Sequence, residues 1–121
     1  MIKEDNVIQR KSYSFAIRII KLVRVLQNKK EFILSNQLLR SGTSIGANVE
    51  EAIGGQTKKD FIAKVSIAYK ESRETKYWVR ILHDTEMINN KEYLSLLDDL
   101  DQIQKLLVSI LKTAKHNLDD R

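Results

Sequence analysis

The sequence contains no cysteine and no proline, and histidine occurs only at His83 and His116. Without cysteine the chain has no disulfide, no thiolate nucleophile and no thiolate metal ligand. A di-iron bundle site would need glutamate three residues before each histidine, but Arg80 precedes His83 and Thr113 precedes His116 at that spacing. The sequence also lacks a Walker loop, a Gly-x-Ser-x-Gly elbow and a dinucleotide fingerprint. We therefore expect no catalytic residue, no metal and no cofactor, and a metal-dependent enzyme is the least favoured class.

Long apolar runs are also absent. No stretch of 18 or more residues is free of charge, as a bilayer span would require. The first residues lack the basic and then apolar layout of a secretory signal. We expect a cytoplasmic protein with no membrane contact. At 121 residues, 42% apolar and 31% charged, the chain fits a single globular domain over 1–121.

Glycine is scarce, since all four glycines lie between Gly42 and Gly55, which leaves too few turn residues for an all-β chain. The apolar side chains instead recur at helical steps of four and three, as in Phe15, Ile19, Leu22 and Leu26. Start signals are Thr57 with Asp60 and Asn89 with Glu92, and a left-handed C-cap is expected at Gly54-Gly55. The predicted helices are 11–27, 32–54, 58–88 and 91–116. Short connections predict an all-α, antiparallel up-down-up-down four-helix bundle.

The predicted helices 11–27 and 91–116 carry more apolar residues than a single core-facing stripe requires. A monomer would leave part of this surface in water, which favours a homo-oligomer. The alternative is that the core of a four-helix bundle uses wide stripes. The surplus residues are Ile17, Ile20, Val23, Val25, Leu97, Leu106, Val108, Leu111 and Leu118.

Small residues crowd the second predicted helix. Gly42 and Gly46 share a helix face, and each glycine inside a helix costs about 0.5–1 kcal/mol relative to alanine. Close approach of a neighbouring helix would offset this cost. Alternatively, a polar row could meet a partner helix or a ligand. That row consists of Arg40, Ser44, Asn48 and Glu51.

Positive charge is distributed unevenly over a chain of formal net charge +5. Residues 1–30 carry a net +6 and residues 57–83 a net +4, whereas residues 31–56, 84–90 and 91–121 are each net negative. Within the two positive segments, basic side chains recur along one face of each predicted helix, and we call these rows basic ladders. Such rows suit phosphate groups and predict salt-sensitive, sequence-independent binding of RNA or DNA. The alternative is that these cations form a solvent-exposed helix face that binds no partner. The candidate residues for nucleic-acid binding are Lys11, Arg18, Lys21, Arg73, Lys76 and Arg80.

Residues 37–52, with the sequence QLLRSGTSIGANVEEA, resemble the signature of a bacterial four-helix-bundle family encoded in intervening sequences of 23S ribosomal RNA genes. Residues 15–22 (FAIRIIKL), 60–68 (DFIAKVSIA) and 70–78 (KESRETKYW) resemble it too. We call residues 37–52 the signature segment. Its matching positions are Arg40, Ser41, Gly42, Ser44, Ile45, Asn48 and Glu51.

The resemblance implies four antiparallel helices that assemble into a ring, typically a homopentamer, without assigned catalytic residues. It also implies kinship with the accessory protein of diversity-generating retroelements, which forms a basic pentameric barrel, associates with a reverse transcriptase and binds nucleic acid. The resulting expectation is a non-enzymatic oligomer that binds RNA or DNA. The alternative is a scaffold or accessory subunit that recruits another protein and does not bind nucleic acid.

Overall fold

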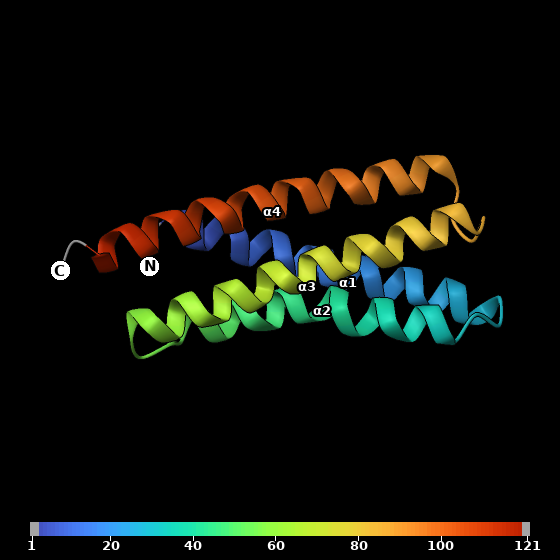
Figure 1. Ribbon diagram of the computed structural model, residues 1–121. Helices are drawn as coiled ribbons and strands as arrows, with labels where there is room; N and C mark the ends of the chain where they lie inside the picture. Colours follow the sequence, from blue (N-terminus) through green and yellow to red (C-terminus); the bar gives the residue numbers. More distant parts are fainter. Residues whose placement is uncertain (1–2, 120–121) are drawn as a thin grey trace.

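The computed structural model describes residues 3–119, which form four helices and no strand. In chain order the helices are α1 (Lys3–Asn28), α2 (Ile33–Ile53), α3 (Lys58–Asp84) and α4 (Asn90–Asp119). Consecutive helices run in opposite directions and lie side by side, and α4 closes the bundle against α1 (Figure 1). The prediction of an all-helical bundle is confirmed.

Two predicted helix bounds are wrong by four residues or more. Helix α1 begins at Lys3 rather than at 11, because the buried side chains of Ile8 and Ser12 extend the core-facing stripe toward the N-terminus. The polar Ser12 interrupts the apolar pattern and hides this extension in the sequence. Helix α3 ends at Asp84 rather than at 88, because Glu86 adopts a left-handed conformation with φ 63°.

The expected helix starts are present as hydrogen bonds. The Thr57 side chain accepts a bond from the backbone N–H of Asp60 at 3.0 Å. The Asn89 side chain accepts one from the backbone N–H of Glu92 at 2.8 Å. Both bonds satisfy amide groups that the first turn of a helix leaves without a partner.

The expected left-handed cap at Gly54-Gly55 is wrong. Gly54 caps α2 with φ −82°, and no glycine has a positive φ. The left-handed residues are instead Lys30, with φ 69°, and Glu86. In the α1–α2 turn, the N–H of Glu31 bonds to the carbonyl of Leu26 and that of Lys30 to the carbonyl of Gln27, which is the Schellman pattern. Both left-handed positions are therefore occupied by residues with a Cβ atom.

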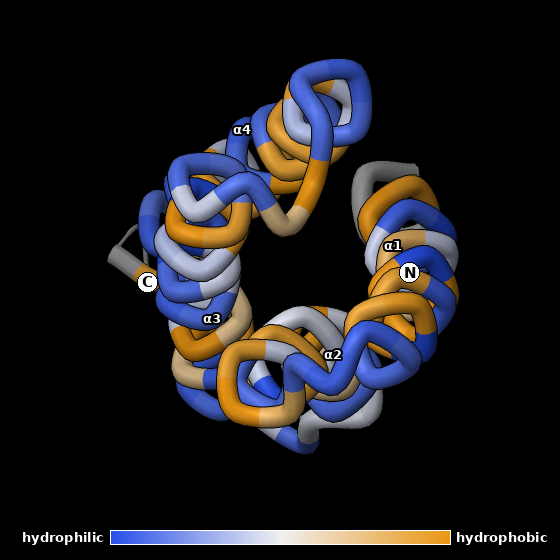
Figure 2. Tube along the Cα trace, turned by 90° about the vertical axis from the view of Figure 1, so that its right-hand side faces the viewer, coloured by the Kyte–Doolittle hydropathy of each residue, from blue (hydrophilic) through white to orange (hydrophobic). Residues whose placement is uncertain are grey.

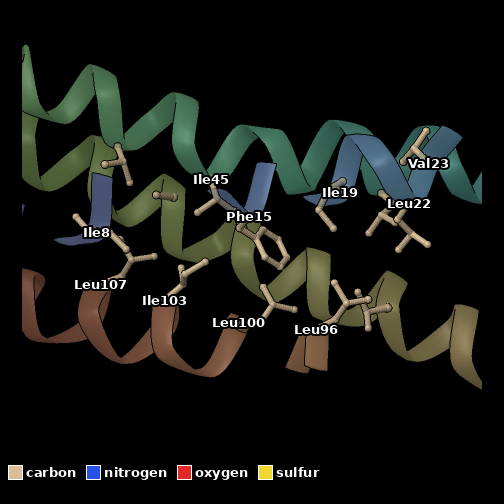
Figure 3. Packing of buried hydrophobic residues seen from close by; sticks show 14 of the residues in the cluster. Ile8, Phe15, Ile19, Leu22, Val23, Ile45, Leu96, Leu100, Ile103 and Leu107 are labelled. Atoms are coloured by element: carbon tan, nitrogen blue, oxygen red, sulfur yellow. The ribbon is translucent and has the colours of Figure 1, made fainter. Parts of the chain in front are cut away.

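The core runs along the axis of the bundle and receives side chains from all four helices. Leu96, Leu100, Ile103 and Leu107 of α4 point toward Ile8 and Phe15 of α1 and Ile45 of α2 (Figure 3). Seen from the end, apolar residues face inward and hydrophilic residues lie mostly outside (Figure 2). This arrangement follows from the helical period of the apolar stripe.

The surplus of apolar residues is smaller than the sequence predicts. Val23 is buried, and Leu97, Leu106 and Leu111 pack against the molecule's own core. Large apolar side chains that remain exposed include Tyr13 (64%) and Ile17 (39%) on α1 and Leu94 (56%) on α4. None of the four helices over residues 3–119 combines the length and apolar character that crossing a bilayer requires.

Candidate functional site

The six cations predicted to bind nucleic acid lie in two separate places, on either flank of α4. Lys11, Arg18 and Lys21 belong to the seam between α1 and α4, where they line two hollows, one of which also contains Asp99 and Gln102. The other three line a hollow between α3 and α4 that also contains Gln104. The structure therefore does not unite the two predicted ladders into one surface. The second ladder consists of Arg73, Lys76 and Arg80.

Among the three cations of the α1–α4 seam, Arg18 and Lys11 bind side chains of α4. The Arg18 guanidinium bridges Glu92 at 3.2 Å and Asp99 at 2.8 Å. The ammonium of Lys11 donates a hydrogen bond of 2.7 Å to the side-chain carbonyl of Gln102. These contacts connect α1 to α4 along the seam with the lightest packing in the bundle. Arg18 is therefore committed to holding two helices together, and its charge is offset by two carboxylates.

Arg18 also divides the α1–α4 seam into two open grooves. The larger one, of about 880 Å³, lies toward the α3–α4 turn and includes Lys21, Lys29 and Lys91 with Met87. The smaller one, of about 490 Å³, lies beyond Arg18 and is lined by Arg10 and Lys11. Basic and acidic side chains share the rims of both grooves, so neither groove presents a surface of one charge sign.

The second set belongs to a surface with much less opposing charge. A hollow of about 830 Å³ along α3 and α4 contains four cations and one carboxylate, Glu74. None of the salt bridges found over residues 3–119 uses any of these four cations. We call this region the α3 basic surface. It is lined by Tyr69, Lys70, Arg73, Glu74, Lys76, Tyr77, Arg80 and Gln104.

Glu71 and Glu74 of α3 pair with a neighbouring helix rather than with the cations of the α3 basic surface. Neither carboxylate forms a salt bridge with Lys70, Arg73 or Lys76, its neighbours on the same helix. Both carboxylates instead pair with Arg40 of α2, the Glu71 contact at 3.1 Å. Glu74 also accepts a 3.0 Å hydrogen bond from the indole N–H of Trp78. Because both carboxylates pair with Arg40, neither forms a salt bridge with the four cations of the α3 basic surface.

The glycines of the signature segment lie where α2 meets α1. A Cβ atom on Gly42 would lie 2.9 Å from the Cγ atoms of Ile19. A Cβ atom on Gly46 would lie 3.2 Å from the backbone oxygen of Ser12. The two helices therefore approach as closely as the paired glycines predict, and this close packing offsets the cost of glycine inside a helix.

The polar members of the signature segment mostly connect α2 to α3. The hydroxyls of Thr75 and Ser41 form a buried hydrogen bond of 3.0 Å, and Glu51 pairs with Lys64 at 3.1 Å. Ser44 and Asn48 bond to backbone carbonyls one turn earlier on α2, those of Arg40 and Ser44 respectively. Ile45 is fully buried in the core. These contacts give every signature position a structural role within the chain.

Sequence reasoning missed five residues that line the α3 basic surface, among them Lys70, Tyr77 and Gln104. The first two could have been found, because Lys70, Arg73, Tyr77 and Arg80 follow one another at steps of three, four and three along one face of α3. Gln104 comes from α4, and no local pattern predicts that it meets α3. Exposed aromatic residues within a basic row are a signal that charge counting alone overlooks.

His83 has one aromatic and one acidic neighbour. His83 stacks on Tyr93 with the ring centroids 3.9 Å apart, and its Nδ1 atom lies 3.2 Å from an Asp84 oxygen. Among the described residues, no three histidine, aspartate or glutamate side chains are grouped so that they could hold a metal ion.

Fold and surface together define an antiparallel four-helix bundle with a basic face on its third helix. A model of the 23S rRNA-intervening sequence protein family matches residues 4–109. The chain belongs to this family.

One solved structure that the chain resembles is a protein with unknown function from the S23 ribosomal protein family of Bacteroides thetaiotaomicron VPI-5482. The two are 49% identical with a TM-score of 0.88, and the match covers 90% of this chain and 98% of the other. A search among curated proteins gives no match.

Proposed function

We propose that this protein is a non-enzymatic, homo-oligomeric helical bundle that binds RNA or DNA through phosphate groups, with the α3 basic surface as its principal contact. The observation that carries the proposal is the set of four cations on this surface that make no salt bridge within the described chain. Cations without an intramolecular partner retain their full attraction for phosphate, and phosphate contacts dominate non-specific nucleic-acid affinity.

Charge reversal tests the proposal. The triple variant Arg73→Glu, Lys76→Glu and Arg80→Glu removes three cations of the α3 basic surface. A matched variant reverses Lys105, Lys112 and Lys115 on α4, none of which lines that surface, and changes the net charge by the same amount. We expect filter retention of RNA and DNA at low salt to be lost in the α3 variant and kept in the α4 variant. Equal loss in both would indicate general charge attraction, and full retention in both would exclude the α3 basic surface as the contact. No retention by the unsubstituted protein would favour a protein-interaction scaffold.

Self-association is the second part of the proposal. Tyr13 and Ile17 are exposed one turn apart on α1, and Leu94 is exposed on α4. Residues 1–30 have a net charge of +6, whereas residues 84–121 are net negative. Contact between α1 of one copy and α4 of the next would cover the apolar groups and pair opposite charges. Such a head-to-tail contact closes into a ring when its rotation allows, and the ring expected from the family resemblance is a pentamer.

Light scattering tests the assembly. We expect a particle about five times the 14.1 kDa of one chain at micromolar concentration. Ile17→Glu places a charge in the proposed contact and should yield a folded monomer. A 14.1 kDa particle for the unsubstituted protein would refute self-association. In that case the exposed apolar residues would favour the scaffold, which recruits a different protein such as a reverse transcriptase.

A further inference from the structure

An exposed aromatic ring lies within the cations of the α3 basic surface. Tyr77 retains 52% of its accessible surface and lines the same hollow as Lys70, Arg73 and Arg80. Their spacing places these four residues on one helix face, with Tyr77 between Arg73 and Arg80. At ~1.5 Å per residue, the row from Lys70 to Arg80 is roughly 15 Å long.

The ring of Tyr77 is not covered by a parallel neighbour. Its aromatic contact within the described chain is with Trp78, at a centroid distance of 5.1 Å and an interplanar angle of 70°. Tyr69, by contrast, is half-buried and packs against the core. Tyr77 is thus an amphipathic ring, held beside a tryptophan and open to a flat partner.

We propose that the α3 basic surface binds single-stranded nucleic acid, with one unpaired base stacked on Tyr77 and the flanking phosphates held by Lys70, Arg73 and Arg80. This inference rests on the nucleic-acid binding proposed above and specifies its substrate class. Cations that follow the backbone, combined with aromatic rings that stack on bases, form the usual recognition mode for single strands. A single narrow row of cations also suits one strand better than the two strands of a duplex.

A duplex would use this surface poorly. Its bases are already stacked on both faces, so that a protein ring cannot reach them without opening the helix, which costs a few kcal/mol. A duplex would therefore contact the cations and leave Tyr77 without a partner. Single-stranded RNA and single-stranded DNA both offer the required chemistry, because every base has a stacking face.

Fluorescence anisotropy with labelled 12-nucleotide RNA and DNA strands, and with the matching DNA duplex, tests this inference on the full chain. We expect both single strands to bind more tightly than the duplex. Tyr77→Leu should weaken single-strand binding about five- to 150-fold, the range for loss of one stacked base, and leave duplex binding unchanged. Tyr77→Phe keeps the ring and should retain the affinity. The control Phe32→Leu removes an aromatic ring of similar exposure, 50%, outside the α3 basic surface and should change nothing.

The chain's single tryptophan provides a local signal. Because Trp78 contacts Tyr77, unlabelled single strands should change its emission with the same dissociation constant that anisotropy gives.

The outcomes separate this inference from the proposed function. If Tyr77→Leu leaves single-strand affinity unchanged, or if the duplex binds as tightly as the single strands, single-strand stacking is refuted while phosphate binding stands. If Tyr77→Phe also loses affinity, the hydroxyl rather than the ring makes the contact, and the stacking inference fails. If no nucleic acid binds at low salt, both proposals fail.

Discussion

Gly42 of α2 lies directly against Ile19 of α1, so that a Cβ atom on the glycine would be 2.9 Å from either Cγ atom of the isoleucine. Ile19 is completely buried, and its branched side chain has one strongly preferred rotamer in a helix. It therefore cannot easily move aside. The position of α1 relative to α2 depends on the absence of a side chain at Gly42.

We predict that Gly42→Ala destabilises the fold. Overpacking a core costs about 1–3 kcal/mol, and the better helix propensity of alanine returns at most about 1 kcal/mol. The expected net loss in the free energy of unfolding is about 1–2 kcal/mol, measured by urea denaturation.

Gly54→Ala is the matched control, because a Cβ atom there would come no closer than 3.7 Å to any other atom and the φ angle is −82°. This variant should be neutral or slightly stabilising. Equal effects of the two substitutions would contradict close packing as the reason for glycine at position 42.

The next prediction concerns the buried hydrogen bond between the hydroxyls of Ser41 on α2 and Thr75 on α3. Thr75→Val removes the partner of the fully buried Ser41 hydroxyl and should cost about 1–3 kcal/mol of stability, the penalty for a buried polar group left unsatisfied. The double variant Ser41→Ala and Thr75→Val removes both polar groups and should recover part of that loss. Chemical denaturation of the two single variants and the double variant measures the coupling, and strictly additive losses would contradict it.

The left-handed conformation of Lys30 predicts that a substitution there can stabilise the fold. Lys30 has φ 69°, a conformation that costs a residue with a Cβ atom about 1–2 kcal/mol. Glycine avoids this cost but loses about 0.5–1 kcal/mol through its more flexible unfolded chain. Lys30→Gly should therefore raise the free energy of unfolding by roughly 0.5–1 kcal/mol. Thermal unfolding measures the effect, and a lower melting temperature would contradict the account of this turn.

The ion pairs of Arg18 predict an effect on stability without one on binding. Arg18→Gln should weaken the α1–α4 seam by about 0.5–1 kcal/mol at low salt and by less at high salt, because the pairs are partly exposed. Nucleic-acid affinity should change less than twofold, since Arg18 is already occupied by Glu92 and Asp99. A large loss of binding with an unchanged melting temperature would place a phosphate contact at Arg18 after all.

Much of the fold follows from local sequence signals. Apolar spacing defines four helices, and the side chains of Thr57 and Asn89 mark two helix starts that the structure contains. The errors have local causes. Ser12 is buried without being apolar, so the beginning of α1 is hidden. The expected left-handed cap at Gly54 is wrong because that glycine has φ −82°, and the left-handed conformation occurs instead at Lys30 and Glu86.

The candidate site is less accessible to sequence reasoning, because it depends on contacts between helices. Arg18 and Arg73 look alike as members of basic ladders, yet only Arg18 meets carboxylates on α4. Glu74 likewise pairs with Arg40 of α2, a residue 34 positions earlier in the chain, and not with a cation of its own helix. Charge patterns thus identify candidate cations, and only the packed bundle separates the paired cations from the available ones.

The salt dependence of binding tests the central claim most directly. For single-stranded nucleic acid, the logarithm of the binding constant should fall with the logarithm of salt concentration at a slope of about −0.7 per neutralised phosphate. If the four cations of the α3 basic surface each neutralise one phosphate, we predict a slope of about −3 for each subunit engaged. Replacing Arg73 and Lys76 by glutamine should reduce its magnitude by about 1.4 for each engaged subunit. A slope near zero, or one that this double variant leaves unchanged, would contradict phosphate binding by the α3 basic surface.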